Sequence, residues 1–265
     1  MPTFDHDTIS QHYEITGDGP PLLLIAGMMS DSASWAPLLP LLEPHFTLIR
    51  PDNRTTGRTT PWDAPATIDI FAADCAALLD HLDLGPAHVM GHSLGGMIAW
   101  ELGCAAPHLV QSLTLAATAP LRLQRNVALF MNLHAIRNSN AAAEVWLNAL
   151  FPWLFSPALY EHSDAVAQAA IASLAYPYAQ SADAMGHQIA ALEGYAPDAN
   201  TPPQVPLQAL LAQDDLIMPL GLAQHALGDV ATHVISGAGH SIHWDAPDAV
   251  AAHLRRFIEG HDNAQ

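Results

Sequence analysis

The feature that most constrains this chain is the run GHSLG at residues 91–95. It follows an apolar stretch at residues 87–90 and precedes residues 96–102, which favour a helix. A serine between spaced glycines at a strand-to-helix turn has the form of a nucleophile elbow, although the five-residue pattern alone is common. In so tight a turn bulkier residues at the glycine positions would collide and the serine backbone is strained. Ser93 would then stand clear of the sheet, in front of free N–H groups of the helix.

The balance of charge limits the partners this chain can have. Its 265 residues are 50% hydrophobic, with eight basic residues against 26 acidic ones and a formal net charge of −18. Such a surface repels nucleic acid and anionic membranes, so we expect neither as a partner. All eight basic residues are arginines, which excludes a Schiff-base lysine, a phosphate-loop lysine and a Ser-Lys dyad.

Metal binding and membrane targeting are not expected either. Cys75 and Cys104 lie in apolar helical stretches without metal-ligand spacing, and we expect buried free thiols. His240 and His243 follow a Gly-Ala-Gly stretch that is typical of a loop, so no metal site is expected there. The start of the chain is acidic and no long apolar segment is present, which predicts a cytoplasmic protein without a signal peptide.

Strand and helix signals alternate along most of the chain. Strands are expected near residues 12–15, 22–25, 46–49, 87–90, 113–115, 205–211 and 232–236, with helices near 35–42, 67–81, 96–107, 220–227 and 247–258. This order predicts an α/β fold with a mostly parallel sheet and helices on both faces. Residues 121–200 contain no convincing strand and are rich in alanine and aromatic residues. We expect a core of residues 1–120 and 201–265, and a helical cap of residues 121–200.

The cap would lie over the carboxyl edge of the sheet, where open α/β sheets bind ligands. Eight of its aromatic residues can pack against one another or line an apolar substrate pocket: Trp146, Phe151, Trp153, Phe155, Tyr160, Tyr176, Tyr178 and Tyr195. We expect both uses, with most of the eight being structural.

The chain resembles the α/β-hydrolase family along nearly its whole length. The matching segments are residues 26–27 (AG), 52–58 (DNRTTGR), 91–96 (GHSLGG), 214–219 (DDLIMP) and 239–243 (GHSIH). In detail it is similar to the cap-bearing esterase and enol-lactonase branch, whose members include cofactor-free perhydrolases. The resemblance implies an α/β-hydrolase fold, no cofactor and no metal, with the order Ser, Asp, His.

The resemblance assigns a catalytic triad to three positions. Ser93 is the nucleophile, and because an alcohol is weakly nucleophilic it needs a base. His240 matches the position of that base, in a glycine-rich loop after a strand, and His243 is expected to give packing or polar support. The acid is expected at Asp215, four residues before Pro219, with the adjacent Asp214 as the competitor.

A further acidic position and the oxyanion hole also follow from the resemblance. Asp52 is expected to brace the arginine-bearing loop after it. The backbone N–H of Leu94 should supply one donor to the developing oxyanion, and that of Met28 the other. Many relatives have His-Gly before the second donor, whereas this chain has Ala26 and Gly27.

The substrate pocket is the least determined part of the site. Met28 and Met29 could present flexible apolar side chains to it or simply fill the core. We expect Met29, Trp146 and Trp153 to line the pocket.

The leading interpretation is a serine hydrolase of small, largely apolar carboxylic esters or lactones, acting through an acyl-enzyme. A C–C bond hydrolase would use the same triad with a carboxylate clamp from Arg54, Arg122 or Arg125, and a perhydrolase would use the same serine with peroxide. A ligand receptor without turnover is the alternative from another class. Haloalkane dehalogenases and epoxide hydrolases are disfavoured because those relatives carry aspartate at the position of Ser93. The sequence leaves the oligomeric state open.

Overall fold

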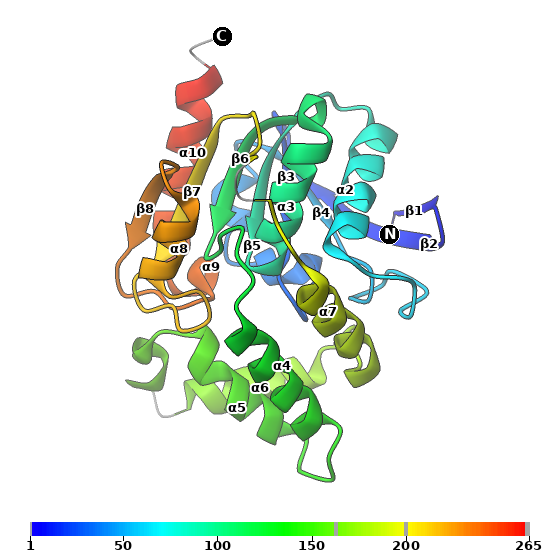
Figure 1. The fold of residues 1–265 in the computed structure, drawn as a ribbon, viewed down its shortest axis with the longest axis vertical. Helices are drawn as coiled ribbons and strands as arrows, with labels where there is room; N and C mark the ends of the chain where they lie inside the picture. Colours follow the sequence, from blue (N-terminus) through cyan, green and yellow to red (C-terminus); the bar gives the residue numbers. More distant parts are fainter. Residues whose placement is uncertain (1, 162–163, 199–200, 263–265) are drawn as a thin grey trace.

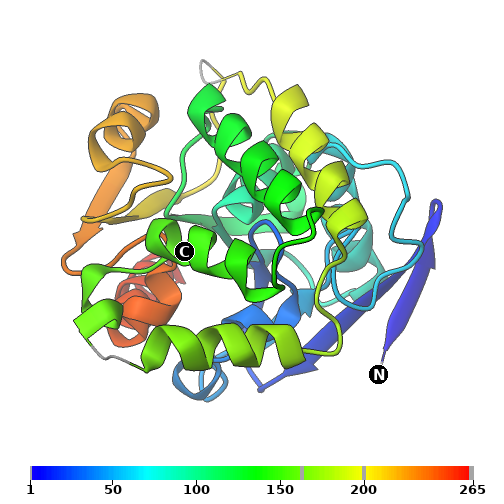
Figure 2. The ribbon, with the colours of Figure 1, turned by 90° about the horizontal axis from the view of Figure 1, so that it is seen from below.

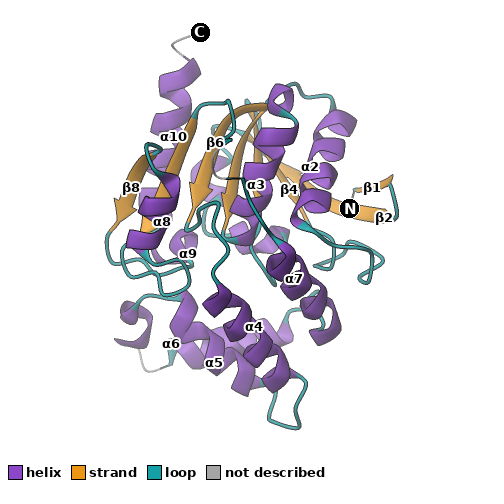
Figure 3. Ribbon diagram, viewed as in Figure 1, coloured by secondary structure: helices purple, strands orange, loops and turns teal. Residues whose placement is uncertain are grey.

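The computed structural model describes residues 2–161, 164–198 and 201–262 and contains one eight-stranded sheet (Figures 1 and 3). The strands are β1 (Thr3–His6), β2 (Ile9–Thr16), β3 (Pro21–Ile25), β4 (Thr47–Pro51), β5 (Ala87–His92), β6 (Val110–Ala116), β7 (Leu207–Ala212) and β8 (Ala231–Ile235). Their order across the sheet is β1-β2-β4-β3-β5-β6-β7-β8. The pairs β1–β2 and β2–β4 are antiparallel, and every pair from β4 to β8 is parallel.

Helices cover both faces of the sheet. The helices of the core are α1 (Leu39–Leu42), α2 (Ile68–Leu82), α3 (Leu94–Ala105), α8 (Leu220–Leu227), α9 (Ile242–Asp245) and α10 (Pro247–Asp262). Strand β3 shows why a continuous apolar run is needed: Leu23 and Ile25 pack with α2 and α3, whereas Leu22 and Leu24 pack with α1 and α10. Strands buried on both faces in this way are typical of parallel sheets, and the α/β class predicted from the sequence is confirmed.

Local signals set the bounds of individual helices. Thr67 caps α2, because its side chain accepts a hydrogen bond from the backbone N–H of Ile70 at 3.2 Å. At the other end Asp83 adopts the left-handed conformation and terminates the helix. The helix expected over residues 35–42 is instead split into a short 3-10 turn, Ser32–Trp35, and the four-residue α1.

The described part of the segment between β6 and β7 is made of helices joined by loops and contains no strand. It holds α4 (Gln124–Arg137), α5 (Glu144–Leu154), α6 (Ala165–Ala175) and α7 (Ala182–Gly194), with a 3-10 turn at Pro157–Glu161. In Figure 1 these helices lie at one end of the sheet, and Figure 2 shows them spread across that end of the core. That end is where β5 reaches Ser93, so the helical insertion covers the carboxyl edge of the parallel strands.

Polar contacts join the helical insertion to the core. The hydroxyl of Tyr176 donates to Asp31 Oδ2 at 2.8 Å, and Gln188 Oε1 accepts from the backbone N–H of Met29 at 2.8 Å. Of the two cysteines, Cys75 is buried as expected, but Cys104 is exposed. The prediction for Cys104 was wrong because it lies on the solvent side of α3. Within the described ranges, no helix has both the length and the apolar character to span a membrane.

Candidate active site

Ser93 lies between β5 and α3 in a strained backbone conformation, with φ 54° and ψ −121°. Its backbone N–H donates to Ala116 O at 2.9 Å, which ties the turn to the neighbouring strand. A Cβ on Gly91 would lie 2.1 Å from Gly95 O, and a Cβ on Gly95 would lie 2.1 Å from Ile25 O. Both glycines are therefore required by close backbone packing, and the surroundings hold the serine in its unfavourable conformation.

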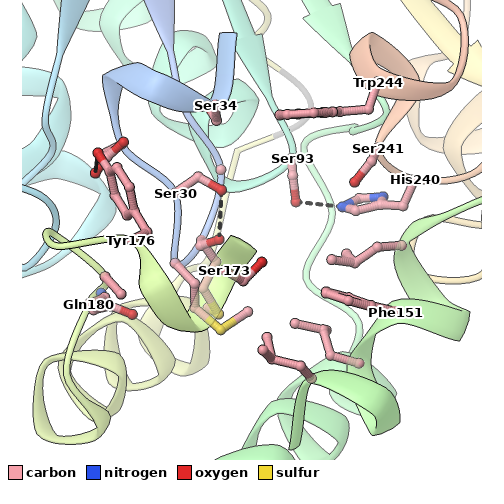
Figure 4. Close-up of a pocket in the computed structure, with 18 of the residues that line it drawn as sticks. Ser30, Ser34, Ser93, Phe151, Ser173, Tyr176, Gln180, His240, Ser241 and Trp244 are labelled. Atoms are coloured by element: carbon pink, nitrogen blue, oxygen red, sulfur yellow. Dashed lines mark hydrogen bonds between the residues drawn. The ribbon is translucent and has the colours of Figure 1, made fainter. Parts of the chain in front are cut away.

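Ser93, His240 and Asp215 form one hydrogen-bonded array. The Ser93 hydroxyl lies 2.8 Å from His240 Nε2, as Figure 4 shows, and His240 Nδ1 lies 3.0 and 2.9 Å from the two carboxylate oxygens of Asp215. His240 and Asp215 are 3% and 5% exposed, so these polar contacts are shielded from water. With a carboxylate on Nδ1, the proton of a neutral imidazole is held there and Nε2 is left as the acceptor facing the serine.

The loop after β7 orients the carboxylate of Asp215, and not that of Asp214, toward His240. Asp215 Oδ1 accepts from the backbone N–H groups of Ile217 and Met218 at 2.8 and 2.7 Å, which fixes the carboxylate toward His240. Asp214 is exposed. Asp52 lies elsewhere, and its Oδ2 accepts from Arg58 N at 2.8 Å and Arg58 Nε at 3.2 Å. It braces the following loop, in the role expected from the sequence.

Two further buried histidines, His92 and His243, lie beside His240. His92 Nε2 lies 2.8 Å from the carbonyl oxygen of His240 and donates to it. The ring of His243 lies 4.5 Å from that of His92 and 4.9 Å from that of Trp35. Burial lowers the pKa of His92 to about 3, and burial also lowers the pKa of His243 well below its ordinary value. Both rings are therefore neutral near pH 7, and His243 packs as the sequence suggested.

The loop after β3 presents its backbone beside Ser93. A Cβ on Gly27 would lie 3.2 Å from Ser93 Cβ, so the glycine permits close approach, and the positive φ of this loop, 62°, is at Met29. The N–H of Met29 is taken by Gln188. In the described part of the chain, the backbone N–H groups of Met28 and Leu94 donate to no protein acceptor. Both remain available beside the serine.

A cavity of about 390 Å³ opens at Ser93 between the core and the helical insertion. Most of its lining is apolar, and six aromatic side chains of the helical insertion contribute to it: Phe130, Trp146, Phe151, Phe155, Tyr176 and Tyr178. Figure 4 shows Ser93 and His240 on one side of the cavity and Tyr176 and Gln180 across from them. More of the eight aromatic residues line this cavity than expected, because α5 and the segment after α6 both face the core.

Only some of the residues expected to line the substrate pocket do so. Met28, Met29 and Trp146 line the large cavity, whereas Trp153 is not part of its lining. Trp153 is half-buried on α5 and packs against the main hydrophobic core. The expectation for Trp153 fails although positions 146 and 153, seven residues apart, face nearly the same way around the helix. Both lie at the edge of the side of α5 that faces the cavity, which is formed by Leu147, Leu150, Phe151 and Leu154, and only Trp146 reaches the cavity.

A second, smaller cavity of about 20 Å³ meets the large one at Ser93. Its walls come from the turn at Ser93, from the loops after β3, β6, β7 and β8, and from α3, α4 and α7. They are lined by Met28, Ser93, Leu94, Met97, Ala117, Thr118, Asn126, Phe130, Leu192, Ile217, Met218 and His240. No sequence pattern indicated this second cavity.

The arginines named as carboxylate clamps serve other contacts. Arg54 is buried against Asp74, with Nε 2.6 Å from Oδ2, and also contacts Asp7. Arg122 and Arg125 donate to backbone carbonyls, of Glu193 and of Leu216 respectively. The arginine at the large cavity is Arg137, whose guanidinium stacks over the ring of Trp146 at 4.4 Å. The described residues contain no group of three or more His, Cys, Asp or Glu side chains that could hold a metal ion.

The doubly covered sheet, the strained serine turn after β5 and the hydrogen-bonded Ser93, His240 and Asp215 side chains are together typical of the α/β-hydrolase fold. Residues 20–247 match the family model described as alpha/beta hydrolase fold, and the chain belongs to that family. It is 30% identical over 248 residues to a protein named "Putative carbamate hydrolase RutD" from Variovorax paradoxus, covering 87% of this chain and 89% of the relative. The protein of the same name from Azorhizobium caulinodans is 41% identical over 104 residues, 39% of each chain.

Solved structures share the whole fold. The structure of "Putative non-heme bromoperoxidase BpoC" from Mycobacterium tuberculosis superposes with a TM-score of 0.83 at 26% identity, covering 97% of this chain and 98% of that one. The enol-lactonase from Burkholderia xenovorans gives a TM-score of 0.80 at 20% identity, covering 97% and 100%. The chain is thus a member of the alpha/beta hydrolase family, and a bromoperoxidase-named structure and an enol-lactonase share its fold.

Proposed function

We propose that this protein hydrolyses carboxylic esters or lactones through an acyl-enzyme on Ser93. The observation that carries the proposal is the 2.8 Å contact between Ser93 Oγ and His240 Nε2, with Asp215 on the opposite ring nitrogen. This is the geometry that activates a serine hydroxyl as a nucleophile. The apolar lining of the large cavity supports small, largely apolar substrates.

The proposed reaction has two halves. Ser93 Oγ attacks the carbonyl carbon while His240 Nε2 takes its proton, and the N–H groups of Leu94 and Met28 stabilise the oxyanion. Collapse of this intermediate expels the alcohol, which His240 protonates. Water then attacks the acyl-enzyme with His240 again as base, releasing the acid and restoring the serine. Asp215 holds the imidazole in the required tautomer and stabilises its charged form.

The relatives extend the set of substrates to be tested. The name of the relatives at 30% identity refers to carbamates, whose carbonyl carbon is open to attack by the same serine. A C–C bond hydrolase receives less support, because Arg54, Arg122 and Arg125 are engaged away from the large cavity. A perhydrolase would be distinguished from an ester hydrolase by its product, a peracid formed from acetate and hydrogen peroxide.

The test is turnover of p-nitrophenyl acyl esters by Ser93→Ala, which should retain its fold and lose catalysis. A matched control is Ser112→Ala. Ser112 is a buried serine whose hydroxyl also lies 2.8 Å from a histidine ring nitrogen, that of His88, but outside both cavities. The control should keep the wild-type rate per folded molecule. Wild-type-like turnover by Ser93→Ala would contradict the proposal.

A further inference from the structure

We infer that the small cavity behind Ser93 is an acyl subsite, selective for short acyl groups that carry a hydrogen-bond donor next to the carbonyl. The selecting atoms are Asn126 Oδ1 and Thr118 Oγ1. Suitable groups are hydroxyacetyl and carbamoyl. This inference rests on the function proposed above and specifies its substrate class.

The first step is the size and closure of the space. Its volume of about 20 Å³ is enough for a group of one or two non-hydrogen atoms, not for an extended chain. Apart from Ser93, every residue that lines it is buried, with Met28 the most exposed at 9%. The large cavity meets it at Ser93.

Because the small cavity is enclosed and the large cavity is open to solvent, the two can be assigned to different parts of a substrate. The leaving alcohol must depart before water can attack the acyl-enzyme, so it needs the roomy side of the serine. The large cavity reaches Trp244, which is 49% exposed, and therefore offers that way out. The group that stays bound between the two halves of the reaction is the acyl group, and the enclosed space suits it. Leu94, a proposed oxyanion donor, also lines the small cavity.

The second step is the chemistry of its walls. Asn126 is 5% exposed, and its Nδ2 donates to Ile217 O at 2.8 Å. A carbonyl can only accept, so this contact identifies the amide nitrogen and leaves Oδ1 as the other atom of the group. Among the described residues, Oδ1 has no hydrogen-bond partner. A buried acceptor in this state costs free energy unless a ligand or water satisfies it.

Thr118 supplies the second polar atom. It is 1% exposed, lines the same cavity, and its Oγ1 has no partner among the described residues. Its Cγ2 is directed at α3, since a Cβ added to Gly96 would lie 2.1 Å from that methyl. A substrate hydroxyl can donate to Asn126 Oδ1 and accept from the Thr118 hydroxyl, and an amino group can donate to both. A methyl group in the same place leaves both atoms unsatisfied.

The experiment compares phenyl hydroxyacetate with phenyl propionate, two esters that differ only by a hydroxyl in place of a methyl group. Each kcat/KM is divided by the alkaline hydrolysis rate constant of the same ester, which removes the intrinsic reactivity difference. We expect the wild-type protein to prefer the hydroxyacetate about three- to tenfold, the range that one or two neutral hydrogen bonds provide. Phenyl hexanoate should be the poorest of the three.

Two variants test the assignment of the atoms. Thr118→Val keeps the shape of the side chain, and Asn126→Leu removes the acceptor. Because Asn126→Leu also removes the contact to Ile217, only the ratio of the two esters within each variant is compared. Each variant should bring the ratio close to one, while Thr114→Val, a buried threonine bound by Gln208, should leave it unchanged.

The outcomes separate this inference from the proposed function. A wild-type corrected ratio near one, or a ratio unchanged in both variants, would mean that the two polar atoms serve a bound water and would overturn the subsite. In that case loss of all turnover in Ser93→Ala would still uphold the proposed function. Failure of the wild-type protein to hydrolyse any of the esters would overturn both.

Discussion

Gln188, a residue of the helical insertion with no exposed surface, accepts a hydrogen bond from the backbone N–H of Met29 at 2.8 Å. That peptide adjoins Met28, whose N–H is a proposed oxyanion donor, and Met29 has a φ of 62°. The helical insertion thus holds the loop of the core that carries this proposed donor. The insertion that lines the large cavity also positions a backbone group for the proposed chemistry.

Gln188→Leu should therefore lower the rate of the chemical step. Loss of one oxyanion donor costs about 10²–10³ in kcat, and because Gln188 acts only through the loop we expect about 10-fold or more, with KM little changed. The measurement is the kcat and KM of ester hydrolysis. Gln208→Leu is the matched control, since Gln208 is a buried glutamine bound to Thr114 in the sheet. A rise in KM with an unchanged kcat would contradict a positioning role.

Asp215→Asn should reduce kcat by about 10⁴ with little change in stability of the fold. An amide at this position can donate to His240 Nδ1, which moves the imidazole proton to Nε2 and blocks acceptance of the Ser93 proton. Asp214→Asn is the control, because Asp214 is exposed and its carboxylate is not bonded to His240. Equal losses in the two variants would contradict the assignment of Asp215.

The neutral state of His92 should appear in the dependence of stability on pH. Its pKa is lowered to about 3 in the folded protein, so between the ordinary histidine pKa of about 6.5 and 3 the unfolded chain binds a proton that the folded chain does not. The free energy of unfolding is thus unaffected by His92 above about pH 6.5. As the pH falls below this value, His92 lowers the free energy of unfolding by about 1.4 kcal/mol per pH unit.

His92→Gln tests this linkage. A glutamine keeps an N–H group that can donate to the carbonyl of His240 but does not titrate. Free energies of unfolding are measured by urea denaturation between pH 7.5 and 4. Below about pH 6.5 they should fall less steeply with pH in the variant than in the wild-type protein, and the difference in slope should be about 1.4 kcal/mol per pH unit. Parallel curves for the two proteins would show that His92 is not the titrating group.

The elbow could be predicted from sequence because its constraints are local. Gly91 and Gly95 must lack side chains next to Ser93, and the five-residue motif at residues 91–95 shows this requirement directly. The family resemblance pointed to Asp215 and to His240, and both side chains lie in one hydrogen-bonded array with Ser93. The alternation of strands and helices likewise gave the α/β class, but the short edge strand Thr3–His6 has few apolar residues and left no signal.

The rest of the site depends on tertiary packing. Gln188, Thr118 and Asn126 come from a helix or loop whose orientation is set only when the helical insertion docks on the core. The wrong placement of Trp153 has the same origin, since Trp146 and Trp153 share nearly one side of α5 and their spacing does not indicate which of them reaches the large cavity. Arg137 was missed because its contact with Trp146 joins two different helices.

The central claim is that Ser93 is the nucleophile, and covalent labelling tests it most directly. A fluorophosphonate transfers its phosphonyl group to an activated serine oxygen with loss of fluoride. Mass spectrometry of the labelled protein should find one adduct, on the peptide carrying Ser93, formed in parallel with the loss of esterase activity. His240→Ala should slow labelling strongly. An adduct on any other residue, or full activity after complete labelling of Ser93, would contradict the account.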